Sequence, residues 1–292
     1  MKIHLIDGTY ELFRNHFGAP PKKSKSGQEV GATLGVLRSL LMLLQSPDVT
    51  HVAVAFDHVI ESFRNKLYSG YKTGSGIDPE LMAQFPLVEK AVAALGVVVW
   101  PMVKYEADDA IGTAALRFAK NKAVDQVIVC SPDKDLAQLV DGKRIVCWDR
   151  RREIIIDEKK VIEKYGVYPE SIPDWLGLVG DSADGFPGIP GWGAKSASAV
   201  LFKYKHIESI PDDSSKWNVK SISPGRAATL AENLNKQKKD ALLFRKLATL
   251  SDDVPLKETL SDLKWQGAHP RLKKICHEMN DEKIPERITR WR

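Results

Sequence analysis

Carboxylate side chains recur in this sequence directly after short apolar runs, where they could hold a metal ion. Asp7 follows the run Lys2–Ile6, and Asp57 follows His51–Phe56. The complete set of candidate ligands is Asp7, Asp57, Glu106, Asp108, Asp109, Asp133, Asp135, Asp181 and Asp184. If these side chains meet at one edge of a sheet, their negative charges repel one another unless cations neutralise them. The set therefore predicts a site for divalent metal ions.

Each carboxylate taken alone has an ordinary structural explanation. Acidic residues cap the first turns of helices, and aspartate is common in turns that contain glycine. As a group, however, oxygen ligands favour Mg²⁺ or Mn²⁺, and nine carboxylates suit two ions. Two such ions activate a water molecule and stabilise the leaving oxygen of a phosphodiester, so the expected chemistry is hydrolysis of nucleic acid.

A second candidate site is the glycine-rich segment 188–197, GIPGWGAKSA. It differs from a nucleotide-binding P-loop because alanine, not glycine, precedes Lys195, and because the preceding segment is a helix and a turn. We expect a hairpin between two helices, with free amides that hold a phosphate without reading base sequence. A tight helix connection with no ligand is the alternative. The candidate DNA contacts are Gly188, Gly191, Gly193, Lys195 and Ser196.

The segment Ser62–Lys72 interleaves basic and aromatic residues, including Arg64, Tyr71 and Lys72. Basic side chains can neutralise a scissile phosphate, and aromatic rings can stack on unpaired bases. A solvated amphipathic helix is an equally good interpretation of this segment alone.

Composition limits the class of protein. The chain has 292 residues, 43% of them hydrophobic and 28% charged, which excludes disorder along the whole chain. It has no long apolar run and no secretory signal layout, and its three cysteines form no CxxC pair, so we expect a cytoplasmic protein without zinc. Residues 1–194 carry 23 Lys and Arg against 25 Asp and Glu, whereas residues 195–292 carry 20 against 13. An acidic part beside a basic part fits a cation site next to a surface for nucleic acid.

Apolar runs alternate with helical patterns through the first half of the chain. Strands are predicted at 2–6, 51–56, 97–100 and 126–130, with helices at 31–45, 79–95 and 106–120. Such alternation predicts a doubly wound parallel sheet, followed by a hairpin over 145–156. Beyond Tyr165 the pattern becomes helical, at 172–179, 195–204, 226–235 and 239–249. We therefore expect an α/β catalytic domain over 1–168 and a smaller helical domain over 169–292.

The motifs occur in a recognisable order. It runs through Asp7-Gly8, Phe56-Asp57, Phe63-Arg64, Gly70-Tyr71-Lys72, Tyr105-Glu-Ala-Asp-Asp109, Pro132-Asp-Lys-Asp-Leu136 and Gly180-Asp-x-x-Asp184, and ends with the glycine segment. Over roughly residues 1–250 this series resembles the bacterial 5′–3′ exonuclease and flap endonuclease family. That family includes the N-terminal nuclease domain of DNA polymerase I and the phage flap nucleases.

The resemblance implies a PIN-like nuclease fold whose helical domain carries a helix-turn-helix hairpin for duplex DNA. It implies two Mg²⁺ or Mn²⁺ ions, the tighter one on Asp7, Asp57, Glu106 and Asp108, with Asp109 beside them. The second would lie on Asp133, Asp135, Asp181 and Asp184. Arg64 and Lys72 would act on the scissile phosphate. Residues 74–95 would form the arch through which the 5′ strand passes. A K⁺ ion is a further candidate ligand, at the 188–193 hairpin.

The implied partner is DNA with a 5′ flap, a nick or a single-strand/duplex junction. We also expect the protein to be a monomer and not to bind a membrane. One departure is Gly185, where the family commonly has asparagine. No polymerase follows Arg292, so we expect the stand-alone form. A PIN-like ribonuclease and a branched-DNA binding protein without catalysis are the competing interpretations. A DNA-binding protein without catalysis would not require the acidic residues after position 130, so their presence argues against that interpretation.

Overall fold

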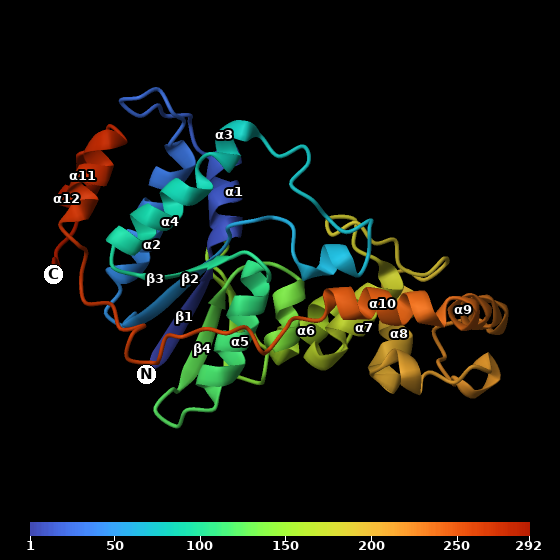
Figure 1. The fold of residues 1–292 in the computed structure, drawn as a ribbon. Coiled ribbons are helices and arrows are strands. Elements are labelled where there is room, and N and C mark those ends of the chain that lie inside the picture. Colours follow the sequence, from blue (N-terminus) through green and yellow to red (C-terminus); the bar gives the residue numbers. More distant parts are fainter. The chain divides into compact units, whose positions relative to one another are not determined.

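The computed structural model describes residues 1–292, and the chain divides into two compact units (Figure 1). The first unit comprises residues 1–62, 74–131 and 251–292, and the second comprises residues 63–73 and 132–250. The expected domain boundary between residues 168 and 169 stays a prediction, since these units are groups of residues in spatial contact. Residues 132–168 group with the helical unit, and the C-terminal segment 251–292 groups with the first unit.

The first unit is built on a parallel sheet. Its strands lie in the order β3 (Val98–Met102), β2 (His51–Asp57), β1 (Lys2–Asp7) and β4 (Gln126–Cys130). In register, Ile3 lies opposite both His51 and Val127. β1 and β2 are buried along nearly their whole length, as their continuous apolar runs predict for strands covered on both faces. Their carboxyl ends carry Asp7 and Asp57.

Helices connect and cover these strands. α5 (Ala107–Ala119) packs on all four strands, and α1 (Gly8–Gly18) packs on α2 (Gly31–Leu44). α1 was not predicted. It begins where the Asp7 side chain accepts a hydrogen bond from the Tyr10 amide, a normal N-terminal cap. The single helix expected over 79–95 is two helices, α3 (Pro79–Met82) and α4 (Phe85–Ala94), because Pro86 suits the first turn of a new helix.

The C-terminal segment returns to the first unit through backbone pairing. The Val52 amide donates to the Leu263 carbonyl at 2.8 Å, and the Trp265 amide donates to the Thr50 carbonyl at 2.9 Å. Beyond them lie α11 (Arg271–Glu278), which contacts α4, and α12 (Lys283–Glu286). These pairings and the buried Leu272 hold the C-terminal segment on the first unit.

The second unit is mainly helical. The antiparallel hairpin β5 (Ile145–Asp149) and β6 (Ile154–Ile156) was predicted. Its α-helices are α6 (Glu158–Tyr165), α7 (Ile172–Val179), α8 (Ala194–Tyr204), α9 (Pro224–Lys236) and α10 (Lys238–Ala248). The short 3₁₀ helices are η1 (Phe63–Lys66), η2 (Asp135–Leu139), η3 (Pro169–Ser171), η4 (Ile207–Ser209) and η5 (Ser214–Lys216). α7 packs closely on α10. The predicted class, a parallel α/β sheet with a helical part, is confirmed.

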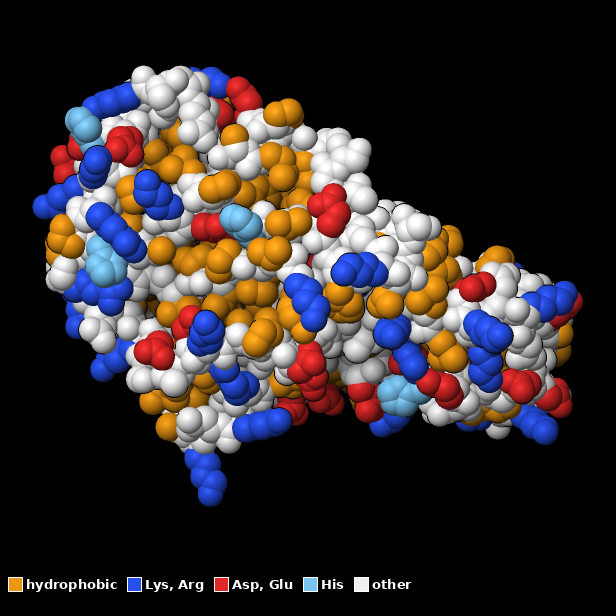
Figure 2. Space-filling model, in the orientation of Figure 1, with side chains coloured by type: hydrophobic (Ala, Val, Ile, Leu, Met, Phe, Trp, Pro, Cys, Tyr) orange, Lys and Arg blue, Asp and Glu red, His pale blue; other side chains and the backbone are white.

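Two further features agree with the composition. None of the helices has the length and apolarity that crossing a membrane would require. All three cysteines are buried and unpaired. Figure 2 shows Lys and Arg side chains interspersed with Asp and Glu, so the face in view carries charge of both signs.

Candidate active site

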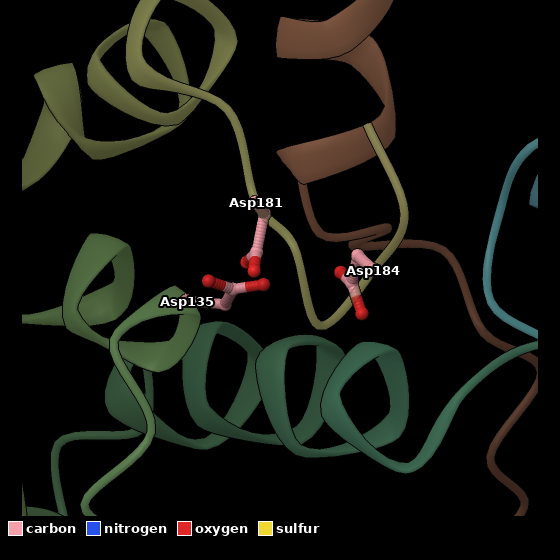
Figure 3. A group of neighbouring side chains, drawn as sticks. All are labelled: Asp135, Asp181 and Asp184. Atoms are coloured by element: carbon pink, nitrogen blue, oxygen red, sulfur yellow. The ribbon is translucent and has the colours of Figure 1, made fainter. Parts of the chain in front are cut away.

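Three predicted metal ligands meet in the second unit. Single carboxylate oxygens of Asp135, Asp181 and Asp184 all lie within 4.8 Å of one another. Asp135 begins η2, whereas Asp181 and Asp184 lie in the turn after α7, and Figure 3 shows the three side chains together. We call these three residues the acidic triad. Asp181 and Asp184 are buried, and Asp135 is half-buried.

One oxygen of the triad is buried without a hydrogen-bond partner. Burial and the neighbouring charges of Asp133 and Asp184 hold the pKa of Asp135 well above its usual range. The Oδ1 atom of Asp135 is buried and has no hydrogen-bond partner. A buried carboxylate oxygen without a partner is costly unless a cation or a donor meets it. The triad thus has the ligand chemistry of a site for a divalent cation.

Two lysines are held directly on the triad. Lys134 Nζ lies 2.6 Å from Asp181 Oδ2, and Lys72 Nζ lies 3.0 Å from Asp184 Oδ1. Burial lowers the pKa of Lys134, but its hydrogen bond to Asp181 and the charges of Asp135 and Asp133 raise that pKa, and the net shift is upward. Lys72 was predicted as a site residue. Lys134 was missed, although its place between two candidate aspartates could have suggested it.

Asp133, the fourth predicted ligand of this group, lies beside the triad. It is exposed, and its Oδ1 accepts a hydrogen bond from the Asp135 amide at 2.9 Å. This bond fixes the start of η2 and with it the position of Asp135.

The turn that carries Asp181 and Asp184 is tightly defined. Asp181 and Phe186 exchange backbone hydrogen bonds, and the Ala183 amide donates to Asp181 Oδ1. Gly185 has a φ of +85°, and a Cβ atom there would lie 2.1 Å from the Gly70 carbonyl oxygen. The departure from asparagine at this position therefore has a physical reason, because segment 70–72 approaches too closely for a side chain.

The other predicted ligands lie in the first unit, where Asp7 and Asp57 end strands β1 and β2, and Glu106, Asp108 and Asp109 lie at the start of α5. Asp7 Oδ2 accepts the Ser131 hydroxyl at 2.9 Å, and Asp57 Oδ1 accepts the Ala107 amide at 2.8 Å. Glu106 Oε1 accepts the Ser62 hydroxyl at 2.7 Å. Asp7 and Glu106 are buried, whereas Asp57 and Asp108 are half-buried. We call Asp7, Asp57, Glu106 and Asp108 the strand-end group.

Asp109 has a different environment. Its side chain is fully buried. Its Oδ2 accepts the Glu106 amide at 2.9 Å, and its Oδ1 accepts the Ser251 amide at 2.8 Å. Both oxygens therefore bind backbone amides, which fixes the start of α5 and the C-terminal segment. These contacts hold Asp109 beside Glu106 and Asp108, and its role as a metal ligand stays a prediction.

Arg64, predicted to act on the scissile phosphate, and Tyr71, predicted to contact DNA, are both buried. Arg64 is 2% exposed, and its guanidinium donates to the carbonyl oxygens of Leu247 at 2.7 Å and Thr249 at 3.0 Å. Tyr71 is 3% exposed, and its hydroxyl donates to Asp184 Oδ2 at 3.1 Å. Arg64 thus stabilises the end of α10, and Tyr71 orients a member of the acidic triad. Sequence patterns show basic and aromatic residues but not which of them are buried.

The glycine hairpin forms the predicted helix connection. Gly188 and Gly191 have positive φ angles of +71° and +83°, and Gly193 begins α8 with extended backbone. The Ser196 hydroxyl bonds to the backbone of Gly193, whereas Lys195 is exposed. Residues 191–196 line an open cavity of about 890 Å³, together with residues 221–223 and Arg226.

Two side chains of α9 hold this hairpin, and neither was predicted from the sequence. Asn233 Nδ2 donates to the Pro190 carbonyl at 2.8 Å, and the Arg226 guanidinium donates to the Gly191 carbonyl. Both residues lie some forty positions after the hairpin, so no local motif could have indicated the contacts.

Comparison with known proteins identifies the fold and the family. The model of the 5′-3′ exonuclease N-terminal resolvase-like domain matches residues 2–166, and that of the 5′-3′ exonuclease C-terminal SAM fold matches residues 167–271. The T5 D15 protein co-crystallised with metal ions superposes with a TM-score of 0.67 at 15% identity, covering 98% of this chain and 96% of that one. This likeness shows a shared fold.

Sequence relatives give the same result. A 5′-3′ exonuclease of Buchnera aphidicola subsp. Baizongia pistaciae is 34% identical over 261 residues, covering 89% of this chain and 85% of the relative. DNA polymerase I of Bacillus subtilis is 34% identical over 270 residues, covering 91% of this chain. The match spans only 30% of that polymerase. With both domain models matched in sequence order, the chain belongs to the 5′-3′ exonuclease family.

Proposed function

We propose that this chain is a nuclease that uses divalent metal ions to hydrolyse phosphodiester bonds in branched or 5′-ended DNA, acting as a monomer. The observation that carries the proposal is the acidic triad, with its unpartnered buried oxygen on Asp135. Family membership supplies the class of reaction, and a T5 flap endonuclease has been solved with DNA and metal ions.

Two hard cations would suit this donor set. The acidic triad, whose carboxylate oxygens lie within 4.8 Å of one another, would hold one ion together with Asp133, and the strand-end group would hold the other, as the family resemblance implies. When bound, such ions lower the pKa of a water molecule and neutralise charge on the phosphodiester. Ser62 and Ser131 orient Glu106 and Asp7 through their hydroxyl groups, and Tyr71 orients Asp184.

Lys72 and Lys134 would act on the phosphate. Each ammonium group lies within 3.0 Å of a triad carboxylate, so a phosphate bound at the triad lies within reach of both. A fixed cation at that place stabilises the negative charge that develops on the phosphate oxygens during cleavage.

The glycine hairpin would hold duplex DNA by its backbone. The N-terminus of α8 is accessible to a phosphate because a Cβ atom at Gly193 would meet nothing within 4 Å, and Lys195 adds a charge at the same end. Contacts of this kind do not depend on base sequence and weaken as salt rises. The enzyme would therefore recognise the shape of its substrate.

K⁺ is not needed in this proposal. Asn233 and Arg226 already donate to the carbonyl oxygens of Pro190 and Gly191, two of the oxygens available to a cation at the hairpin. The Arg226 guanidinium also places a positive charge where K⁺ would be repelled. These side chains, and not a monovalent ion, would hold the hairpin in shape.

The experiment is cleavage of end-labelled substrates. A 5′-flap duplex, a nicked duplex, a fully paired duplex and single-stranded RNA are each incubated with Mg²⁺, Mn²⁺ or EDTA. We expect cleavage of the flap and the nick near the junction with either metal and none in EDTA. The matched variant Asp181→Asn keeps the size of the side chain and should be inactive. Cleavage in EDTA, or RNA cleaved faster than the flap, would contradict the proposal.

A further inference from the structure

A separate cavity lies at the carboxyl end of β5 in the second unit. Its volume is about 430 Å³, at the lower end of the ~300–1,000 Å³ typical of ligand pockets. Its wall is apolar, formed by Pro132, Ile154 and Ile156, and its rim is basic, formed by Arg152, Lys160 and Lys164. None of these residues belongs to the acidic triad or to the glycine hairpin.

The apolar wall is open to solvent. Ile154 is 39% exposed. Covering the exposed part of this side chain with an apolar group stabilises a complex. A flat aromatic ring laid on Ile154 and Ile156 would remove this surface from water.

The basic rim is held in place by its own contacts. Asp149 is buried, and its Oδ1 accepts the backbone amides of Arg151 and Arg152 at 3.1 Å each, which shapes the β5–β6 turn. Arg152 reaches back to Asp149 at 3.5 Å but remains 72% exposed. Lys160 Nζ donates to the Ile155 carbonyl at 2.7 Å, which leaves further hydrogens of the ammonium group for an anion.

We propose that this cavity binds one nucleotide, with the base on the isoleucine wall and the phosphate on Arg152, Lys160 and Lys164. The carboxylate of Glu163, also in the lining, can accept hydrogen bonds from an exocyclic amine or a sugar hydroxyl. The cavity has room for one such unit. The choice of nucleotide rests on the proposed nuclease function, since Pro132 of the wall directly precedes Asp133. The bound unit is either a free monophosphate or the end of a strand.

The test measures binding in EDTA, where cleavage and metal take no part. Isothermal titration calorimetry compares deoxyadenosine 5′-monophosphate, deoxyadenosine, inorganic phosphate and a 5′-phosphorylated tetranucleotide. We expect the monophosphate to bind at least about tenfold more tightly than either fragment, since a charge-assisted hydrogen bond contributes on that scale. Tighter binding of the tetranucleotide would assign the site to strand ends, and weaker binding would assign it to free product.

Two variants and one control locate the site. Arg152→Ala with Lys164→Ala removes two rim cations, and Ile154→Asp changes the exposed wall. Both should weaken monophosphate binding about tenfold or more. Arg151→Ala is the matched control, because Arg151 lies in the same turn but outside the lining. The proposal would be overturned if Arg151→Ala weakened monophosphate binding as much as the two variants do. It would also be overturned if inorganic phosphate bound as tightly as the nucleotide, or if the nucleotide did not bind at millimolar concentration. Because no cleavage is measured, a failed nuclease assay leaves this result unaffected.

Discussion

Replacing Asp135 by asparagine should stabilise the protein in EDTA while abolishing its activity. Asp135 is the triad member that has no lysine paired with it, since Lys134 pairs with Asp181 and Lys72 with Asp184. Asp135→Asn therefore removes repulsion and the cost of a buried charge without breaking an ion pair. It also gives the buried position a neutral side chain of the same size.

The magnitude follows from the geometry. Two unit charges 4.8 Å apart repel by about 2–3 kcal/mol at an effective dielectric constant of roughly 20–40. The two lysines offset much of this repulsion, so we expect a gain of about 1–2 kcal/mol in the free energy of unfolding. Mg²⁺ should reverse the order, because an ion present at 100 times its Kd stabilises the wild type by about 2.7 kcal/mol and the variant by less.

Urea denaturation of both proteins, in EDTA and in Mg²⁺, measures these differences. Asp141→Asn is the control, since Asp141 is exposed and lies outside the triad. The reasoning is refuted if Asp135→Asn is less stable than the wild type in EDTA, or if Mg²⁺ stabilises both proteins equally. In either case the triad would not be a cation site whose carboxylates repel one another.

Three further predictions concern other parts of the chain. Lys72→Ala should lower the single-turnover cleavage rate on a saturating flap substrate, whereas Arg64→Ala should lower the thermal midpoint because it leaves buried carbonyls unpaired. Burial, reinforced by nearby carboxylates, raises the pKa of the Cys276 thiol to about 12 from a usual 9.0. Above pH 9 the thiol therefore ionises in the unfolded chain but not in the folded one. The free energy of unfolding should fall by about 2 kcal/mol between pH 9 and 10.5, and this fall should be smaller in Cys276→Ala. Duplex binding should be equal in KCl and NaCl at the same ionic strength, and a gain specific to K⁺ would show that the hairpin binds that ion after all.

The strands and the acidic residues at their ends could be predicted from the sequence. Continuous apolar runs such as His51–Phe56 indicate buried parallel strands, and a parallel sheet brings their carboxyl ends to one edge. The roles of individual ligands could not be predicted. Asp109 has the same residue type and spacing as a metal ligand, but the Ser251 amide that binds it comes from a segment far along the chain.

Long-range contacts also account for the other differences. Arg64 was expected at the phosphate, yet its partners at the end of α10 lie more than 180 positions away. The return of the C-terminal segment depends on pairing between Val52 and Leu263, which no periodic pattern reveals. By contrast, the hairpin glycines were identified correctly as a helix connection, because positive φ at Gly188 and Gly191 is a local requirement.

The central claim is that the strand-end group and the acidic triad each hold a divalent ion. The most direct measurement is a count of bound Mn²⁺ by electron paramagnetic resonance in the wild type, Asp7→Asn and Asp135→Asn. We predict two ions per chain in the wild type and one in each variant, with all three proteins folded. A wild type that binds no ion or only one, or variants that still bind two, would contradict the claim.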